Sequence, residues 1–242
     1  MNTITRYISG LCLSWLLTGM CFGATSQEAE AWFEDDGDMK SLLVNEGQLT
    51  FLAKQPEKPP LHSMNIITID KKSMQSGWVD LQQCYENLDA IAKVEITYSK
   101  VMRNLSVISH QGVGAAHVQG QSVQLRNVAH HATLCIHAQV HVLRNRGGGR
   151  YELEQGPYHR RFLDGFYPFH LSMRIVYPKQ ELIVDDVLMK QGLRDSAPWS
   201  SLEKGPKEGV GPGMRLARAD GELAMDSFFE GALVVGVRFK AR

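Results

Sequence analysis

The sequence predicts an all-β protein, built as two tandem antiparallel β-sandwich modules of the immunoglobulin-like type after a cleaved signal peptide. Three observations predict this arrangement. Apolar and polar residues alternate over short stretches, turn residues recur at intervals of about ten residues, and the order of these features is repeated along the chain. A sustained helical period is absent from the sequence, which argues against a helical protein.

The first 23 residues are predicted to be the signal peptide. One basic residue, Arg6, precedes an apolar run that extends to about Leu17, and small residues follow near Gly23 and Ala24. A membrane anchor needs about 20 consecutive apolar residues, whereas polar residues and glycines interrupt this run. We therefore expect cleavage after Gly23, a periplasmic or secreted protein, and no transmembrane segment in the mature chain.

The repeat begins at two related stretches, VDLQQCYENLD at 79–89 and YELEQGPYHRRFLD at 151–164. An alternating strand follows each of them, KVEITYSK at 93–100 and HLSMRIVYPK at 170–179. A glycine turn comes next in both copies, and each copy ends on a strand rich in apolar residues. The repeat thus predicts two modules of the same architecture.

These features divide the chain after the signal peptide into four parts. Residues 24–40 are expected to be a poorly ordered tail, and 41–143 to form the first module together with its N-terminal strands. The RNRGGGR stretch at 144–150 is expected to be a Gly-rich linker or a hairpin tip. The second module is expected at 151–242, with a long loop at 185–213. A single continuous sandwich is the main alternative.

The cysteines predict one disulfide. Removal of the signal peptide takes away Cys12 and Cys21 and leaves Cys84 and Cys135. Because an oxidising compartment allows these two only one pairing, we predict a Cys84–Cys135 bridge in the first module. The Cα atoms should then lie about 4.4 to 6.8 Å apart. Closing a loop of about fifty residues contributes at most about 4 kcal/mol of stability.

A segment rich in aromatic residues and arginine, GPYHRRFLDGFYPFH at 156–170, is the best candidate for a binding surface. Aromatic side chains and arginine dominate the hot spots of binding surfaces. The alternative is structural, with the apolar residues closing one end of the sandwich. The residues predicted to bind are Tyr158, Arg160, Arg161, Phe166, Tyr167 and Phe169.

Histidines suggest metal binding as a second class of function. Four of them are concentrated in HHATLCIHAQVH, namely His130, His131, His137 and His141. If this segment is a strand, Cys135, His137, Gln139 and His141 share one face. Two histidines four residues apart on a strand stand about 13 Å apart, so one metal needs ligands from other strands as well. Partly exposed histidines on a sheet surface are therefore the simpler interpretation, and we predict no cofactor.

Two histidine and methionine pairs, His62 with Met64 and His170 with Met173, extend the same alternative to periplasmic copper or zinc.

Net charge favours no particular partner, because 26 basic residues stand against 26 acidic ones, and nucleic-acid binding is not expected.

Local catalytic motifs such as G-x-S-x-G and H-E-x-x-H are absent from the sequence. We therefore expect a non-enzymatic protein, although a Ser/His/Asp set assembled from distant strands leaves no local motif. The resulting hypothesis is an exported, non-catalytic binding or accessory module whose partner is another protein of the cell envelope.

Overall fold

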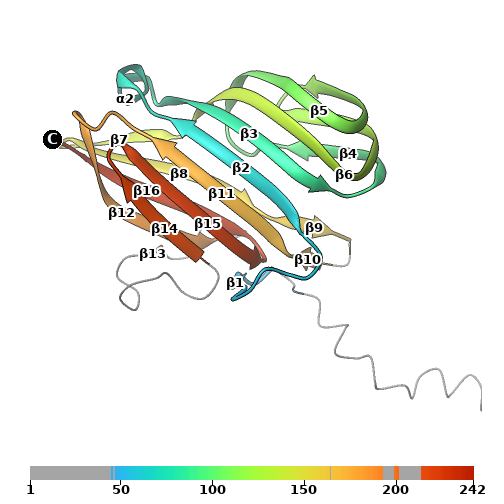
Figure 1. The fold of residues 1–242 in the computed structure, drawn as a ribbon. Coiled ribbons are helices and arrows are strands. Elements are labelled where there is room, and N and C mark those ends of the chain that lie inside the picture. The colour runs from blue at the N-terminus through green and yellow to red at the C-terminus, as the bar shows by residue number, and fades with distance from the viewer. Residues whose placement is uncertain (1–44, 46, 164, 193–198, 202–213) are drawn as a thin grey trace, which may run out of the picture. The chain divides into compact units, whose positions relative to one another are not determined.

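The computed structural model describes residues 45, 47–163, 165–192, 199–201 and 214–242. Residues 44–242 belong to one compact unit, to which the description below is confined. The predicted signal peptide, the tail at 24–40 and the expected strand at 41–44 lie outside the described residues. Strands dominate the described part of the chain, which confirms the all-β class (Figure 1).

Two sheets form the body of this unit. The nine-stranded sheet consists of β1 (Thr50–Phe51), β2 (Leu61–Thr68), β3 (Trp78–Leu88), β4 (Ile91–Thr97), β5 (Met102–Gln119), β6 (Ser122–His141), β11 (Phe169–Val176), β14 (Met214–Ala219) and β15 (Glu222–Glu230). Its order is β1-β15-β11-β2-β3-β6-β4, with β14 beside β15 and β5 beside β6. The five-stranded sheet has the order β13-β12-β16-β8-β7. Its members are β7 (Leu143–Gly147), β8 (Arg150–Tyr158), β12 (Leu182–Gln191), β13 (Ser200–Ser201) and β16 (Leu233–Ala241).

Two smaller elements complete the described structure. A separate hairpin pairs β9 (Arg160–Phe162) with β10 (Gly165–Tyr167) and lies between β8 and β11 along the chain. The short helix α2 (Lys71–Ser76) begins at Asp70, whose carboxylate accepts a hydrogen bond of 2.6 Å from the Ser73 amide. Among the described residues, no helix has the length and apolar character needed to cross a membrane.

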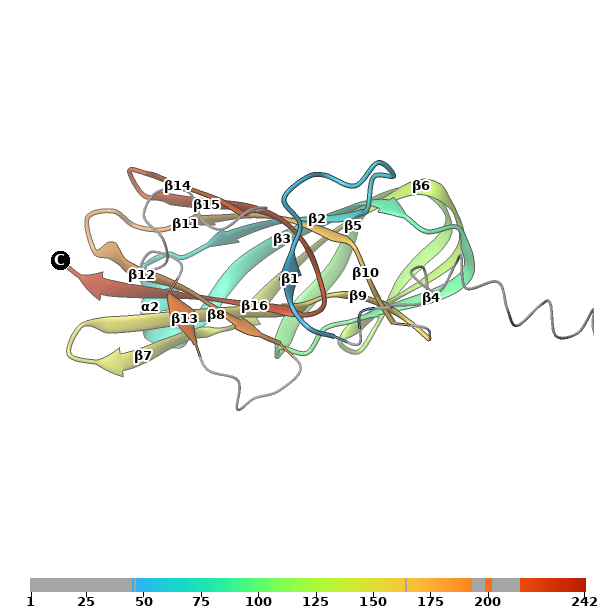
Figure 2. The same cartoon turned by 90° about the horizontal axis from the view of Figure 1, so that it is seen from below.

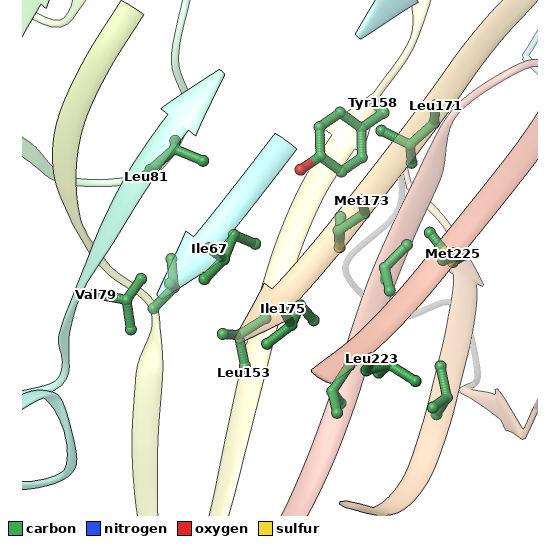
Figure 3. Close-up of a cluster of buried hydrophobic side chains, with 14 of the residues drawn as sticks. Ile67, Val79, Leu81, Leu153, Tyr158, Leu171, Met173, Ile175, Leu223 and Met225 are labelled. Carbon is green, nitrogen blue, oxygen red and sulfur yellow. The ribbon is translucent and has the colours of Figure 1, made fainter. Parts of the chain in front are cut away.

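The main core lies between the two sheets, which Figure 2 shows as facing layers. The alternation predicted for 170–179 turns Leu171, Met173 and Ile175 of β11 inward, and all three are buried. From the smaller sheet, residues such as Leu153 of β8 pack against them (Figure 3). A second core fills the end of the unit where β4, β5 and β6 extend beyond β11.

The structure does not confirm the division into two immunoglobulin-like modules. All eight residues of β2, from the predicted first module, pair in parallel with β11, from the predicted second module. The supposed equivalent strands β3 and β8 lie in different sheets, although both copies do contain the expected glycine hairpin. Alternation and turn residues specify strands and hairpins but not the partner of each strand, which explains why similar local patterns take different places.

Two boundaries differ from those expected. The RNRGGGR stretch contains the tip of the β7–β8 hairpin, which is the second of the two roles expected for it. The segment expected as a loop at 185–213 begins as strand, because β12 continues to Gln191. Further along, Trp199 packs against Gly236 and lies 4.6 Å below the Lys190 ammonium, and the rest of that loop lies largely outside the described residues. At the N-terminal side, β1 pairs with β15 and not with the first predicted module.

The Cys84–Cys135 disulfide is present, as predicted. Its two residues face each other directly on the neighbouring antiparallel strands β3 and β6. Their Cα atoms are 4.0 Å apart, closer than the expected range, because the bridge joins adjacent strands of one sheet and does not cross between two sheets.

Candidate functional site

The predicted binding segment runs along one end of the unit, but its six residues have different environments. Tyr158, Phe166 and Phe169 are buried and are therefore not available to a partner protein, which corrects the prediction of a single exposed surface. Arg161 is exposed and Tyr167 is half-buried, whereas the tip of the hairpin exposes Phe162 and Leu163. The segment thus combines the two roles that the sequence left open, a structural one and a surface one.

An ion pair holds the β9–β10 hairpin to the opposite sheet. The Arg160 guanidinium donates two hydrogen bonds, of 2.6 and 3.1 Å, to the Asp89 carboxylate in the turn between β3 and β4. The same guanidinium lies 5.3 Å from the Phe162 ring centroid and 5.5 Å from that of Tyr167. Because the Arg160 guanidinium is bound at two points and flanked by two aromatic rings, it fixes the hairpin against the end of β3.

Behind this hairpin lies a cavity of about 320 Å³. Its walls come from β3 and β4 on one side and from β8 and β9 on the other. Three amide side chains in the wall are almost completely buried, with exposed fractions of 2% for Asn65, 4% for Gln83 and 5% for Gln155. Apolar and aromatic residues make up most of the remaining wall, including Leu61, Leu81, Leu88, Val94, Ile96, Phe169 and three tyrosines.

Each of the three amides has one polar atom without a hydrogen-bond partner. Asn65 and Gln83 face each other on β2 and β3, and both donate through their nitrogens to the Ser63 hydroxyl, at 3.1 and 3.0 Å. The oxygens Asn65 Oδ1 and Gln83 Oε1 remain unpaired, as does the nitrogen Gln155 Nε2 on β8. The three amides therefore provide two free acceptors and one free donor, and the Tyr98 hydroxyl in the same wall is a fourth buried polar group without a partner.

Tyrosine hydroxyls add further donors to the same wall. Burial raises the pKa of Tyr85, Tyr98 and Tyr158, that of Tyr98 to about 12. All three hydroxyls therefore stay protonated at neutral pH and are able to donate hydrogen bonds.

A second ion pair closes the cavity near Tyr98. The Lys100 ammonium lies 2.7 Å from a Glu154 carboxylate oxygen on β8. Burial raises the pKa of Glu154, but the hydrogen bond and the charge of Lys100 outweigh burial and hold the pKa below its usual value. Two ion pairs, with Arg160 and Lys100 as their cations, thus connect the two walls at the rim of the cavity.

The outer face of the large sheet carries a different polar cluster. His62 on β2 and His170 on β11 stack with ring centroids 3.8 Å apart. Within hydrogen-bond reach of His62 are Glu86 at Nδ1, 3.3 Å away, and the Ser172 hydroxyl at Nε2, 2.8 Å away. His170 Nε2 lies 2.8 Å from Asp226. A histidine between a carboxylate and a hydroxyl is the geometry by which a catalytic Ser/His/Asp or Ser/His/Glu set is recognised when its members come from distant strands.

The Ser172 hydroxyl, however, donates its proton to Asp226 Oδ2, at 2.8 Å, and not to His62. Burial lowers the pKa of His62, and the neighbouring His170 lowers it further, against the opposing effect of Glu86. Burial raises the pKa of Asp226, but hydrogen bonds from His170 and Ser172 outweigh it and lower the pKa overall. This pattern keeps Asp226 ionised as the acceptor for the serine proton.

The histidines proposed as metal ligands do not converge. His137 binds Asp80 at 2.8 Å, His141 lies 3.2 Å from the Ser76 carbonyl oxygen, and His131 contacts Asn87. As predicted, Cys135, His137 and Gln139 share the outer face of β6, opposite buried neighbours. In the described part of the chain, no group of three or more His, Cys, Asp or Glu residues is arranged to hold a metal ion. Met173 is buried on the face of β11 opposite His170, so these two do not form a ligand pair.

Sequence reasoning missed the three amides that line the cavity. One signal was available, because the alternation in β3 that turns Val79, Leu81 and Tyr85 inward also turns Gln83 inward. The convergence of Gln83 with Gln155 had no local signal, since it depends on how the two sheets face each other.

Comparisons with known proteins find likeness only among solved structures. No protein-family model matches the chain, and no curated protein matches it. An M1 zinc metallopeptidase from Deinococcus radiodurans is similar at 11% identity and a TM-score of 0.34, over 80% of this chain and 43% of the peptidase. Legionella pneumophila aminopeptidase A, in complex with aspartic acid, is similar at 10% identity and a TM-score of 0.34, over 78% of this chain and 22% of that one. The chain thus spans less than half the length of these peptidases, and such weak likeness assigns neither a family nor an activity.

Proposed function

We propose that this chain is an exported, non-catalytic protein of the cell envelope that binds a small molecule in the cavity behind the β9–β10 hairpin. One observation carries the proposal: three buried amides in one cavity wall, Asn65, Gln83 and Gln155, each have an unpaired polar atom. Leaving such a group unpaired costs about 1–3 kcal/mol, so a molecule that pairs with it gains affinity from that contact.

The size and lining of the cavity support the same function. Ligand pockets are mostly apolar clefts of about 300–1,000 Å³ with a few converging polar groups, and this cavity of about 320 Å³ lies at the lower end of that range. The segment that the sequence singled out for binding contributes Tyr158, Arg160, Arg161 and Phe169 to the lining. In this proposal the β9–β10 hairpin moves away from the cavity to admit the ligand. The Arg160–Asp89 ion pair holds the hairpin in the closed position.

The test is native mass spectrometry of protein incubated with a small-molecule extract of the cell envelope. We expect a reproducible added mass on the wild type that is reduced at least tenfold in occupancy on Gln83→Leu. The matched control is Gln82→Leu, because Gln82 is the neighbouring residue of the same type and is exposed on the outer face. Absence of any added mass on the wild type would refute the proposal. Export is tested separately by N-terminal sequencing of periplasmic material, which should begin at Ala24.

The Glu86–His62–Ser172 arrangement favours a second candidate function, acyl transfer by Ser172. In that reaction the serine oxygen would attack the carbonyl carbon of an ester or amide while His62 Nε2 accepts the serine proton. The bond to the alcohol or amine would then break, and His62 would return the proton to that leaving group. The existing hydrogen bond from Ser172 to Asp226 competes with this transfer, so we place the candidate second.

A fluorophosphonate probe distinguishes the two candidates, because it labels serines that are activated as nucleophiles. We expect no labelling of the wild type above the level of Ser172→Ala. Stoichiometric labelling that disappears in Ser172→Ala and in His62→Gln would favour the catalytic candidate.

A further inference from the structure

The polar atoms of the cavity also indicate which kind of molecule it takes, an inference that rests on the proposed function. We infer that the ligand is a small, uncharged molecule with a primary carboxamide, or an equivalent group with neighbouring N–H and C=O, attached to an apolar or aromatic body.

The hydrogen-bond complement points to the carboxamide. Asn65 Oδ1 and Gln83 Oε1 are both acceptors, and they belong to residues directly paired across β2 and β3. The orientation of Asn65 is set by its nitrogen, which approaches the carbonyl oxygens of Ser63 and Ser172 and so acts as the donor. A primary amide nitrogen has two protons, one for each acceptor. Its carbonyl oxygen is then free to accept from Gln155 Nε2 on the facing sheet.

The charges around the cavity indicate that the ligand is neutral. Asp89 is paired with Arg160, and Lys100 is paired with Glu154. The Arg161 guanidinium lies over the Phe166 ring, and burial followed by the charge of Arg161 lowers the pKa of His159, which keeps it uncharged at neutral pH. The Arg161 guanidinium is exposed, and Glu95, the other carboxylate of the lining, is also exposed and is hydrogen-bonded to Ser122 and Gln124. A charged ligand in the buried, apolar part of the cavity would leave these charges at the solvent-exposed surface, and burying its own charge without a partner is costly.

The remaining wall sets the size and nature of the ligand body. Three tyrosines, Phe169 and several aliphatic residues line the cavity, which favours a flat apolar or aromatic group. A volume of about 320 Å³ lies at the lower end of the range of about 300–1,000 Å³ for ligand pockets, so the ligand is of fragment size.

Three probes of similar shape test the inference: benzamide, benzoate and toluene. Binding to the full mature chain is measured by ligand-observed NMR at neutral pH. We expect benzamide to bind at least tenfold more tightly than toluene, and benzoate to bind more weakly than toluene. Equal binding of toluene or benzoate would overturn the inference, because the amide would then contribute nothing.

Variants locate the binding. Gln155→Leu should weaken benzamide binding at least tenfold while leaving toluene binding within about twofold, and Gln82→Leu should change neither. Gln83→Leu provides the same comparison if Gln155→Leu does not fold. An added mass from the envelope extract together with no benzamide binding would overturn the carboxamide inference and leave the proposed function standing. If neither the extract nor any probe binds, the proposed function fails as well.

Discussion

Arg160 on β9 and Asp89 after β3 are joined by two hydrogen bonds, of 2.6 and 3.1 Å, across the mouth of the cavity. These two residues are 71 positions apart in the chain, so their ion pair connects the β9–β10 hairpin to the larger sheet. The stability and the motion of the hairpin should therefore depend on this contact, together with the burial of Phe166 and its backbone hydrogen bond to Asn45.

Arg160→Met is expected to lower the free energy of unfolding by about 1–2 kcal/mol, because hydrogen bonds to charged groups contribute about 1.5–3 kcal/mol and this pair is partly exposed. Amide hydrogens of residues 160–167 should exchange faster with solvent. Urea unfolding and hydrogen exchange with mass spectrometry measure the two effects. Arg161→Met is the control, because Arg161 is exposed and its guanidinium lies over the Phe166 ring. Equal effects of the two variants would show that the Arg160–Asp89 ion pair does not hold the hairpin in place.

Ile67→Ala tests whether the compact unit of residues 44–242 unfolds in a single step. Ile67 is completely buried in the core shared by both predicted modules, and removing such a side chain costs about 2–5 kcal/mol. We expect a single unfolding transition at lower temperature, together with faster hydrogen exchange in β16 of the facing sheet. Ile66→Ala, on the outer face of the same strand, should cost less than half as much. Two separate transitions, with only one of them shifted, would instead support independent modules.

Removal of the disulfide should destabilise the whole unit. The bridge spans 51 residues, and the loop-entropy model gives about 4 kcal/mol as the upper limit of its contribution. We expect Cys84→Ala/Cys135→Ala to lower the midpoint of the single transition, because β3 and β6 belong to the sheet that also contains β11 and β15. Under the proposed export, thiol titration of the denatured mature protein should find no free thiol. Two reactive thiols there would show that the bridge does not form in the cell.

Stability should fall when the pH is lowered from about 7.5 to about 5.5. The folded-state pKa of His62 lies below its ordinary value of 6.5, chiefly because of burial, and that of His159 is also lowered. The unfolded chain therefore binds protons that the folded chain does not bind, and the free energy of unfolding decreases as the pH falls through 6.5. Urea titrations at several pH values measure this slope. His62→Phe, which keeps a ring beside His170, should reduce it; an unchanged slope would contradict the assignment.

A further loss should follow at more acidic pH. The pKa values of Asp226 and Glu154 are lowered in the folded state, so the stability that they contribute is present above their ordinary pKa values. It is lost as the pH falls through the folded-state values. Asp226→Asn should remove part of this acid-dependent loss, as measured by the same titrations below about pH 4.5.

The pattern of residues along the chain was sufficient to predict the all-β class, the inward face of β11, the shared face of Cys135, His137 and Gln139 on β6, two of the glycine hairpins and the cysteine pairing. Each of these depends on local alternation, on turn chemistry or on the two cysteines that follow the predicted signal peptide, so short stretches of sequence contain the necessary information. The arrangement of the strands into two sheets was not predictable from local sequence. Pairing β2 with β11 and placing β3 and β8 in opposite layers depends on burial of faces far apart in sequence.

The candidate site shows the same division. The aromatic and arginine-rich segment stood out by composition, but only the tertiary structure separated its buried members from Arg161 and Tyr167. The convergence of Asn65, Gln83 and Gln155 on one cavity was invisible in the chain, because their positions differ by up to ninety residues and nothing local relates them. Local sequence determines which way a side chain points from its strand. Which other side chains it meets is determined by the packing of one sheet on another, a property of the whole fold.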